Sequence, residues 1–98
     1  MIGKYVIVRC HDAGVHAGTL VSHSGRECEL ASARRLWRWR VKDNLGIALG
    51  DVAVHGLDVR DTRVCAAVAV TLCDVCEIIA CSDAAEANIS GFAVYAPR

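Results

Sequence analysis

The sequence has little that would mark it as a secreted, membrane-bound or strongly charged protein. It contains one proline, two tryptophans, two tyrosines and one phenylalanine among 98 residues. Its longest nearly uncharged apolar run, residues 64–72, is half of the roughly 18 residues that a membrane span needs, so we expect no membrane association. The chain begins Met-Ile-Gly-Lys without the apolar core of a signal peptide, which favours a reducing, cytoplasmic setting.

Charge and length narrow the class of protein further. Eleven basic and eleven acidic residues give a formal net charge of zero, which argues against strong nonspecific binding to nucleic acid. The length predicts a single domain over residues 1–98. An apolar fraction of 54% is high for so small a chain, and a neutral chain has no net charge to resist association. We therefore expect a homo-oligomer that covers the surplus apolar surface.

The alternation of residues predicts a mainly β fold with a minor helical part. The expected strands are residues 4–10, 15–23, 26–30, 33–41, 64–72 and 75–80. A short helix is expected behind an Asn44 cap, ending at Gly56, and a second over residues 84–90, where Asp83 and Glu86 resemble a capping box. Residues 92–95 are expected to form an extended tail. This order predicts a small, strongly bent antiparallel sheet or an SH3/Sm-like barrel with one or two short helices.

The segment most informative about function is residues 34–40, which read Arg-Arg-Leu-Trp-Arg-Trp-Arg and hold both tryptophans. Alternation along a strand would put the tryptophans and Arg35 on one face and the other arginines on the opposite face. One interpretation is that the tryptophans are core residues and the arginines a solvated face. In the other, the guanidinium groups bind phosphate and an indole edge binds a base. The candidate ligand-binding residues are Arg34, Arg35, Arg38, Arg40, Trp37, Trp39, Arg9 and His16.

Cysteines and histidines form no motif of a metal site or an enzyme. Cys73 and Cys76 have the spacing of half a zinc site, which Cys65 and Cys81 would complete, but a strand sends positions 73 and 76 to opposite faces. No nucleophile elbow or metal-binding histidine pair is present. We expect a non-enzyme without metal or cofactor and with reduced cysteines. The thiols expected inside apolar strands are Cys10, Cys28 and Cys65.

The first 40 residues resemble a family of small, uncharacterised phage-encoded proteins. The likeness rests on Val6-Ile-Val-Arg9, Ala13-Gly-Val15, Ala17-Gly-Thr-Leu20, Ser22, Gly25, Leu30, Ala33-Arg-Arg-Leu-Trp37 and Trp39, with a weaker echo at Glu77-Ile-Ile79 and Cys81. The first three strands are also similar to the first half of Sm-like barrels, whose second block with its Arg-Gly pair is missing here. The phage resemblance implies the cytoplasm of a host cell, and the Sm-like resemblance implies a bent barrel that forms rings.

Three functions from different classes follow. The first is a phage-type oligomer that sequesters an anionic nucleotide signal of host defence, as other small phage proteins do. The second is a protein-interaction module that inhibits a host defence enzyme. The third is an Sm-like RNA-binding barrel, which the zero net charge disfavours.

Overall fold

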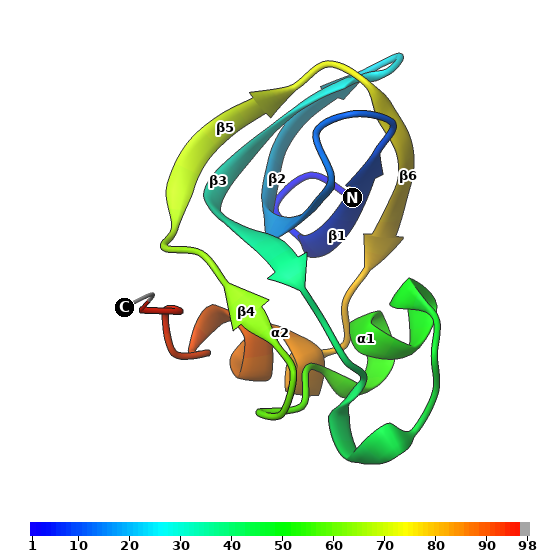
Figure 1. The fold of residues 1–98 in the computed structure, drawn as a ribbon. Helices are drawn as coiled ribbons and strands as arrows, with labels where there is room; N and C mark the ends of the chain where they lie inside the picture. Colours follow the sequence, from blue (N-terminus) through cyan, green and yellow to red (C-terminus); the bar gives the residue numbers. More distant parts are fainter. Residues whose placement is uncertain (97–98) are drawn as a thin grey trace.

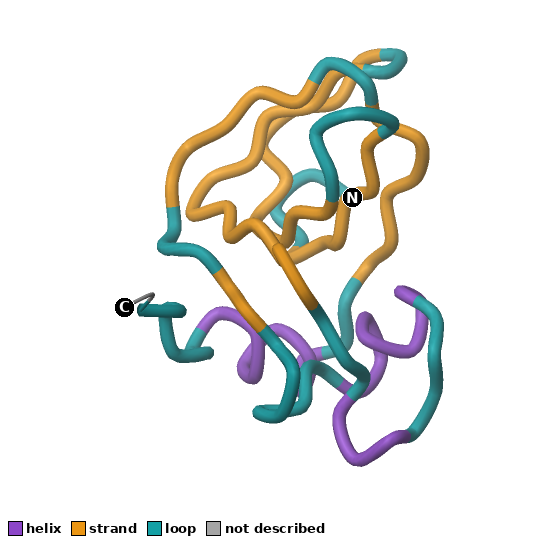
Figure 2. Tube along the Cα trace, viewed as in Figure 1, coloured by secondary structure: helices purple, strands orange, loops and turns teal. Residues whose placement is uncertain are grey.

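The computed structural model describes residues 1–96, and Figure 1 shows a curled sheet with two short helices packed at one end. Figure 2 separates the strands of the upper part from the helices and longer loops below them. The elements in chain order are β1 (Tyr5–Cys10), β2 (Val15–Ser24), β3 (Glu27–Arg38), the 3-10 helix η1 (Lys42–Asn44), α1 (Leu49–His55), β4 (Arg63–Val64), β5 (Val68–Leu72), β6 (Val75–Ala80) and α2 (Asp83–Ser90).

All pairings in the sheet are antiparallel, and the long strand β3 organises them. It pairs with β2, and also with β5 near its beginning and with β4 near its end. On the far side β2 continues to β1, and β1 pairs with β6. Although only two residues join β5 to β6, these strands do not pair with each other. The bent antiparallel sheet with two short helices confirms the predicted fold class, and the barrel is not closed.

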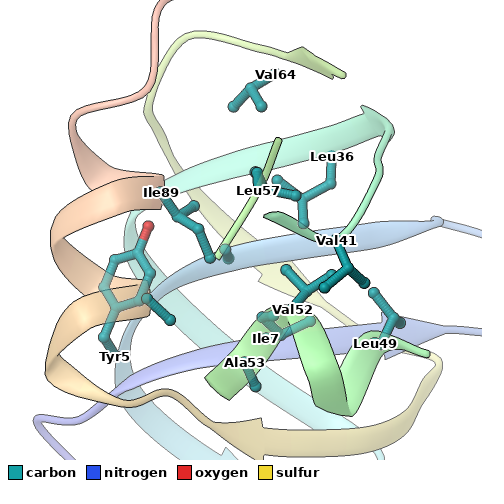
Figure 3. Packing of buried hydrophobic residues seen from close by; sticks show 12 residues of the cluster. Tyr5, Ile7, Leu36, Val41, Leu49, Val52, Ala53, Leu57, Val64 and Ile89 are labelled. Carbon is teal, nitrogen blue, oxygen red and sulfur yellow. The ribbon is translucent and has the colours of Figure 1, made fainter. Parts of the chain in front are cut away.

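The buried apolar residues form two clusters because β1 is covered on both faces. Val6 and Val8 point into the curl of the sheet, together with Leu20 and Leu30. Tyr5 and Ile7 point to the opposite side. This second cluster, shown in Figure 3, packs β1 and the end of β3 against both helices. Its principal residues are Tyr5, Ile7, Leu36, Val41, Leu49, Val52, Leu57, Val64 and Ile89.

Strict alternation failed along β3, because this strand contains two irregularities. The predicted strands 26–30 and 33–41 are joined into one strand that ends at Arg38 and leaves residues 39–41 outside. Within it Ser32 has a positive φ of 50°, and the register with β5 shifts between Leu30 and Ala33. A second shift, in the pairing with β4, lies between Leu36 and Arg38. Each extra residue in a bulge reverses the faces of the residues that follow it, so a period of two cannot be continued across it.

Both helices begin and are capped at residues other than the predicted ones. The first helix begins at Leu49, and the side chain of Asp51 accepts hydrogen bonds from Ile47 N and Ala48 N, whereas Asn44 caps nothing there. Gly56 ends it as predicted. In the second helix the cap is Ser82, whose hydroxyl accepts from Ala85 N at 3.1 Å. The predicted strand 64–72 is broken at residues 65–67 into β4 and β5.

Candidate ligand-binding groove

An open groove lies where the end of β3, β4 and the C-terminal tail meet. Its volume is about 340 Å³, and its lining residues are Trp37, Arg63, Cys65, Ala66, Val94 and Tyr95. We call it the Trp37 groove. The size falls in the range of small-molecule sites, ~300–1,000 Å³. Its walls are mostly apolar, and the single charged side chain among the lining residues is Arg63.

The bulge near the end of β3 directs the side chains of this strand. Leu36 pairs with Val64 and Arg38 with Arg63, so Trp37 and Arg38 together oppose one residue of β4. Leu36 enters the core, 3% exposed, whereas Trp37 is 60% exposed. Bulges commonly re-aim side chains at functional sites in this way. The expectation that Trp37 belongs to the core is therefore wrong.

Arg63 is stacked between two aromatic rings. Its guanidinium carbon lies 5.2 Å from the centroid of the Trp37 ring and 4.7 Å from that of Tyr95, both within the range of cation–π attraction. Stacking leaves the in-plane N–H donors of a guanidinium available for an anion. Within residues 1–96, no carboxylate forms an ion pair with Arg63 or with Arg38, its partner in the β3–β4 register. The groove therefore carries the unpaired charge of Arg63, and Arg38 lies opposite Arg63 in the strand register with a second unpaired charge.

Arg34 builds the groove from inside the protein. It is 4% exposed, and its guanidinium donates to Cys65 O at 3.0 Å, to Ile89 O at 3.0 Å and to Phe92 O. These carbonyls belong to the β4–β5 link, the last turn of α2 and the start of the tail. A cation at the C-terminal end of a helix is also favoured by the helix dipole. Arg34 thus fixes two walls of the groove, and its guanidinium is buried against backbone carbonyls instead of lining the groove itself.

The tail reaches the groove by adding to the edge of β4. Tyr95 N donates to Val64 O at 2.9 Å. The tail therefore lies beside β4 at Tyr95, outside any helix or strand, and carries the Tyr95 ring over Arg63.

The other predicted ligand residues do not gather at this groove. Arg35 is exposed, and its guanidinium packs over Gly14 in the β1–β2 turn. Arg9 is paired with Glu77 at 2.8 Å. Trp39 is half-buried against the helix-side cluster. His16 is buried, and its Nε2 lies 2.8 Å from Ala13 O. Burial lowers the pKa of this imidazole below its usual value.

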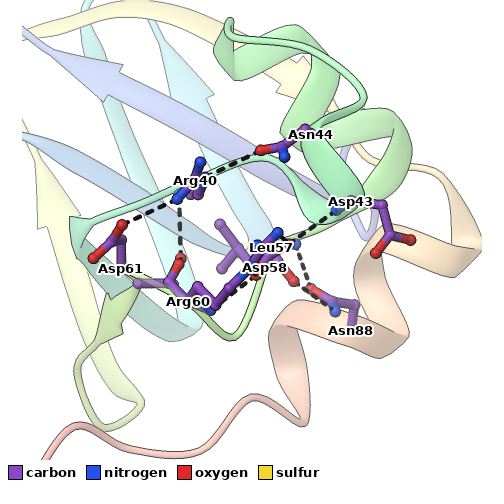
Figure 4. Close-up of polar contacts among 9 residues, drawn as sticks. Arg40, Asp43, Asn44, Leu57, Asp58, Arg60, Asp61 and Asn88 are labelled. Atoms are coloured by element: carbon purple, nitrogen blue, oxygen red, sulfur yellow. Dashed lines mark hydrogen bonds and ion pairs between the residues drawn. The ribbon is translucent and has the colours of Figure 1, made fainter.

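Arg40 belongs to a separate polar network, shown in Figure 4. It donates to Asn44 Oδ1 at 3.2 Å and pairs with Asp61 at 3.0 Å. Beside it, Asp58 is 6% exposed and accepts two side-chain bonds from Arg60, which hold the pKa of that carboxyl well below its usual range. Because these charges already have partners, the network fixes the loops between β3 and β4 and leaves Arg40 little capacity for a ligand.

The cysteines fall into two environments. Cys10 and Cys28 are buried as predicted, and burial raises the pKa of the Cys10 thiol to about 12. Cys65 is exposed, contrary to the prediction, because it follows buried Val64 and its side chain lines the Trp37 groove. No group of three or more potential metal-binding side chains occurs in the described residues. Nor does any helix within residues 1–96 reach the length and apolarity needed to cross a membrane.

The family model described as a domain of unknown function (DUF6948) matches residues 3–89. The chain belongs to this family. The part matched to DUF6948 includes Trp37, Arg63, Cys65 and Ala66 of the groove, whereas Val94 and Tyr95 lie beyond it. No curated protein and no solved structure matches the chain.

Five of the six lining residues of this DUF6948 chain were not among the predicted site residues, and Arg63 and Tyr95 are the two of them that stack on each other. Arg63 lies before an uncharged run and Tyr95 in a short tail, and nothing in either segment indicates that it packs against the end of β3. The only available signal was chemical: Arg63 is a cation next to an apolar stretch, and Tyr95 is one of five aromatic residues.

Proposed function

We propose that this chain is a non-catalytic binding protein whose Trp37 groove takes a planar, anionic ligand of the nucleotide class. The observation that carries the proposal is the pairing of Arg38 with Arg63 beside two aromatic rings. Like charges placed opposite each other on two strands are destabilising. An anion between them would remove that repulsion.

Each part of the groove suits one part of such a ligand. The in-plane donors of Arg63 and Arg38 would bind phosphate oxygens, at ~1.5–3 kcal/mol for a hydrogen bond to a charged group. The exposed indole of Trp37 offers a surface on which a base can stack, which contributes ~1–3 kcal/mol per base. Arg34 would act only through the walls that it holds. The resemblance to phage proteins extends this proposal: the ligand would be a nucleotide signal of host defence, which the protein sequesters in the host cytoplasm.

Calorimetric titration with nucleoside mono- and diphosphates, cyclic nucleotides and short single-stranded RNA tests the proposal. We expect one of these nucleotides to bind, and Arg38→Ala or Arg63→Ala to weaken that binding ten- to hundredfold, as the loss of one charge-assisted hydrogen bond requires. Arg35→Ala is the matched control, because Arg35 is an exposed arginine of the same strand that is not opposite Arg63 and whose guanidinium packs over Gly14. If none of the nucleotides binds, or if all three variants bind alike, the proposal fails.

One observation favours a second candidate, the protein-interaction module. Leu45 and Ile47, in the loop before α1, are 55% and 93% exposed, and Val54 of α1 is 54% exposed. Exposed apolar side chains that lie close along the chain are typical of protein contacts. Under this proposal, Ile47→Glu would abolish inhibition of a host enzyme in an activity assay while leaving nucleotide titrations unchanged.

A further inference from the structure

The strand β5 has one edge on which no backbone hydrogen bond to another described segment is found. Its other edge pairs with β3 from Cys28 to Ala33. Within residues 1–96, no other strand joins β5, and no turn or loop hydrogen bond involves its five backbone amides or carbonyls. An unpaired edge of this kind is a ready template for another strand.

The sequence of β5 contains none of the usual protections against pairing. It reads Val-Ala-Val-Thr-Leu, without charge, proline or glycine, and it lies in a nine-residue segment, 64–72, that is free of all three. Val68, Ala69 and Thr71 are exposed, Val68 by 58%, and Val70 is half-buried. Natural proteins usually blunt such an edge with lysine, proline or a covering segment. The geometry points to an edge that a partner covers.

We propose that β5 pairs with β5 of a second copy, antiparallel about a two-fold axis at Val70. In a two-fold interface the same patch must be complementary to itself. Around this axis Val68 faces Leu72 of the partner copy, Val70 faces Val70, and Ala69 faces Thr71, so apolar residues meet apolar residues and small residues meet small ones. The axis therefore fits a second copy better than an unrelated, charged strand.

Pairing in this register would also extend the apolar cluster inside the curl. Leu72 is a buried member of that cluster and Val70 packs against it, whereas Val68 on the same face is left in solvent. A partner strand beside β5 would place Leu72 of the second copy next to Val68 and continue the cluster across the axis.

The free edge of β6 is a poorer candidate for the same contact. Glu77 in the middle of β6 is charged and paired with Arg9. A charge within an edge strand is a recognised device against edge-to-edge pairing. The uncharged edge of β5 is therefore the better candidate for pairing with a second copy.

Two double variants that differ at one position test the interface. Ala69 and Thr71 are both exposed in the single chain, so charges there should not disturb its fold. Ala69→Lys with Thr71→Lys puts lysine opposite lysine twice across the axis, whereas Ala69→Glu with Thr71→Lys puts glutamate opposite lysine. Ala80→Lys, at an exposed position of β6, is the control for added charge.

Light scattering after size exclusion should give twice the 10.5 kDa chain mass for the unmodified protein, for the glutamate–lysine variant and for Ala80→Lys. The lysine–lysine variant should dissociate at a concentration roughly tenfold higher or more. Circular dichroism should show the same fold in all four. A monomeric unmodified protein at micromolar concentration, or a lysine–lysine variant that dissociates no more easily than the glutamate–lysine variant, would overturn the proposal.

Discussion

Replacing Arg34 should separate a structural arginine from its exposed neighbours on the same strand. Its guanidinium is buried, has no carboxylate partner within residues 1–96, and depends on three backbone carbonyls. Arg34→Ala removes all the donors at once and leaves the carbonyls of Cys65, Ile89 and Phe92 without this partner. We expect this change to loosen the tail and α2 as well as to lower the free energy of unfolding.

The size of the loss follows from the contacts. An unsatisfied buried carbonyl costs ~1–3 kcal/mol, and water that enters along the loosened tail recovers part of this. Removal of the buried cation offsets a further part of the destabilisation, because the cost of desolvating that charge disappears. We therefore expect Arg34→Ala to destabilise the fold by about 3–5 kcal/mol, a large share of the ~5–15 kcal/mol that holds a small domain. Arg34→Lys should lose less, because an ammonium group keeps the charge and can retain part of the bonding.

Urea denaturation followed by tryptophan fluorescence measures these differences, since Trp37 lines the groove whose other walls Arg34 holds. Arg38→Ala is the matched control: it is exposed on the same strand and should change stability by less than ~0.5 kcal/mol. If Arg34→Ala is no more destabilising than Arg38→Ala, the three carbonyl bonds do not hold the tail and the reasoning is refuted.

Three further outcomes are expected. Trp37→Ala should leave the fold intact and weaken nucleotide binding by about ten- to hundredfold, whereas Leu36→Ala should cost ~2–5 kcal/mol in denaturation; equal losses of stability would contradict the assigned faces. Because burial holds the pKa of His16 below its usual 6.5, only the unfolded chain takes up this proton as the pH falls through that value. Stability should be at its full value above pH 6.5 and decline below it, and His16→Gln should flatten that slope in thermal unfolding scans. A maleimide should label Cys65 rapidly and Cys10 only after unfolding, as read by mass spectrometry; labelling of Cys10 at the same rate would refute its burial.

The sequence predicted the strands well where burial alternates or is continuous. The run from Tyr5 to Val8 is apolar at every position because both faces of β1 are covered, and β6 and both helix ends at glycine follow local rules. The two bulges in β3 could not be predicted, because a bulge depends on which strand lies opposite, and that pairing is non-local. At the second bulge Arg38 is exposed, although alternation predicts it on the same face as buried Leu36.

The groove was predictable only in part for the same reason. The sequence identified Trp37 and Arg38, which are adjacent in the chain, as candidates. It did not identify Arg63 and Tyr95, which reach them through the β4 pairing and the tail. The carbonyl partners of Arg34 could not be predicted, because composition does not distinguish a guanidinium that binds phosphate from one that binds carbonyls: both use the same donors.

The double burial of β1 has a consequence for how its register is specified. When one face of a strand is polar, a slip by one residue exposes the core, so burial alone fixes the alignment. In β1 a slip would exchange Val6 and Val8 for Ile7 and leave both faces apolar. The alignment must then depend on specific hydrogen bonds at the strand end. Asp74 provides two of them, since its carboxylate accepts hydrogen bonds from the backbone amides of Asp12 and Ala13 just after β1. Removal of that carboxylate should therefore let some molecules adopt a slipped alignment of β1 while the chain remains folded. Such molecules would appear in an NMR spectrum as a second set of amide resonances for β1.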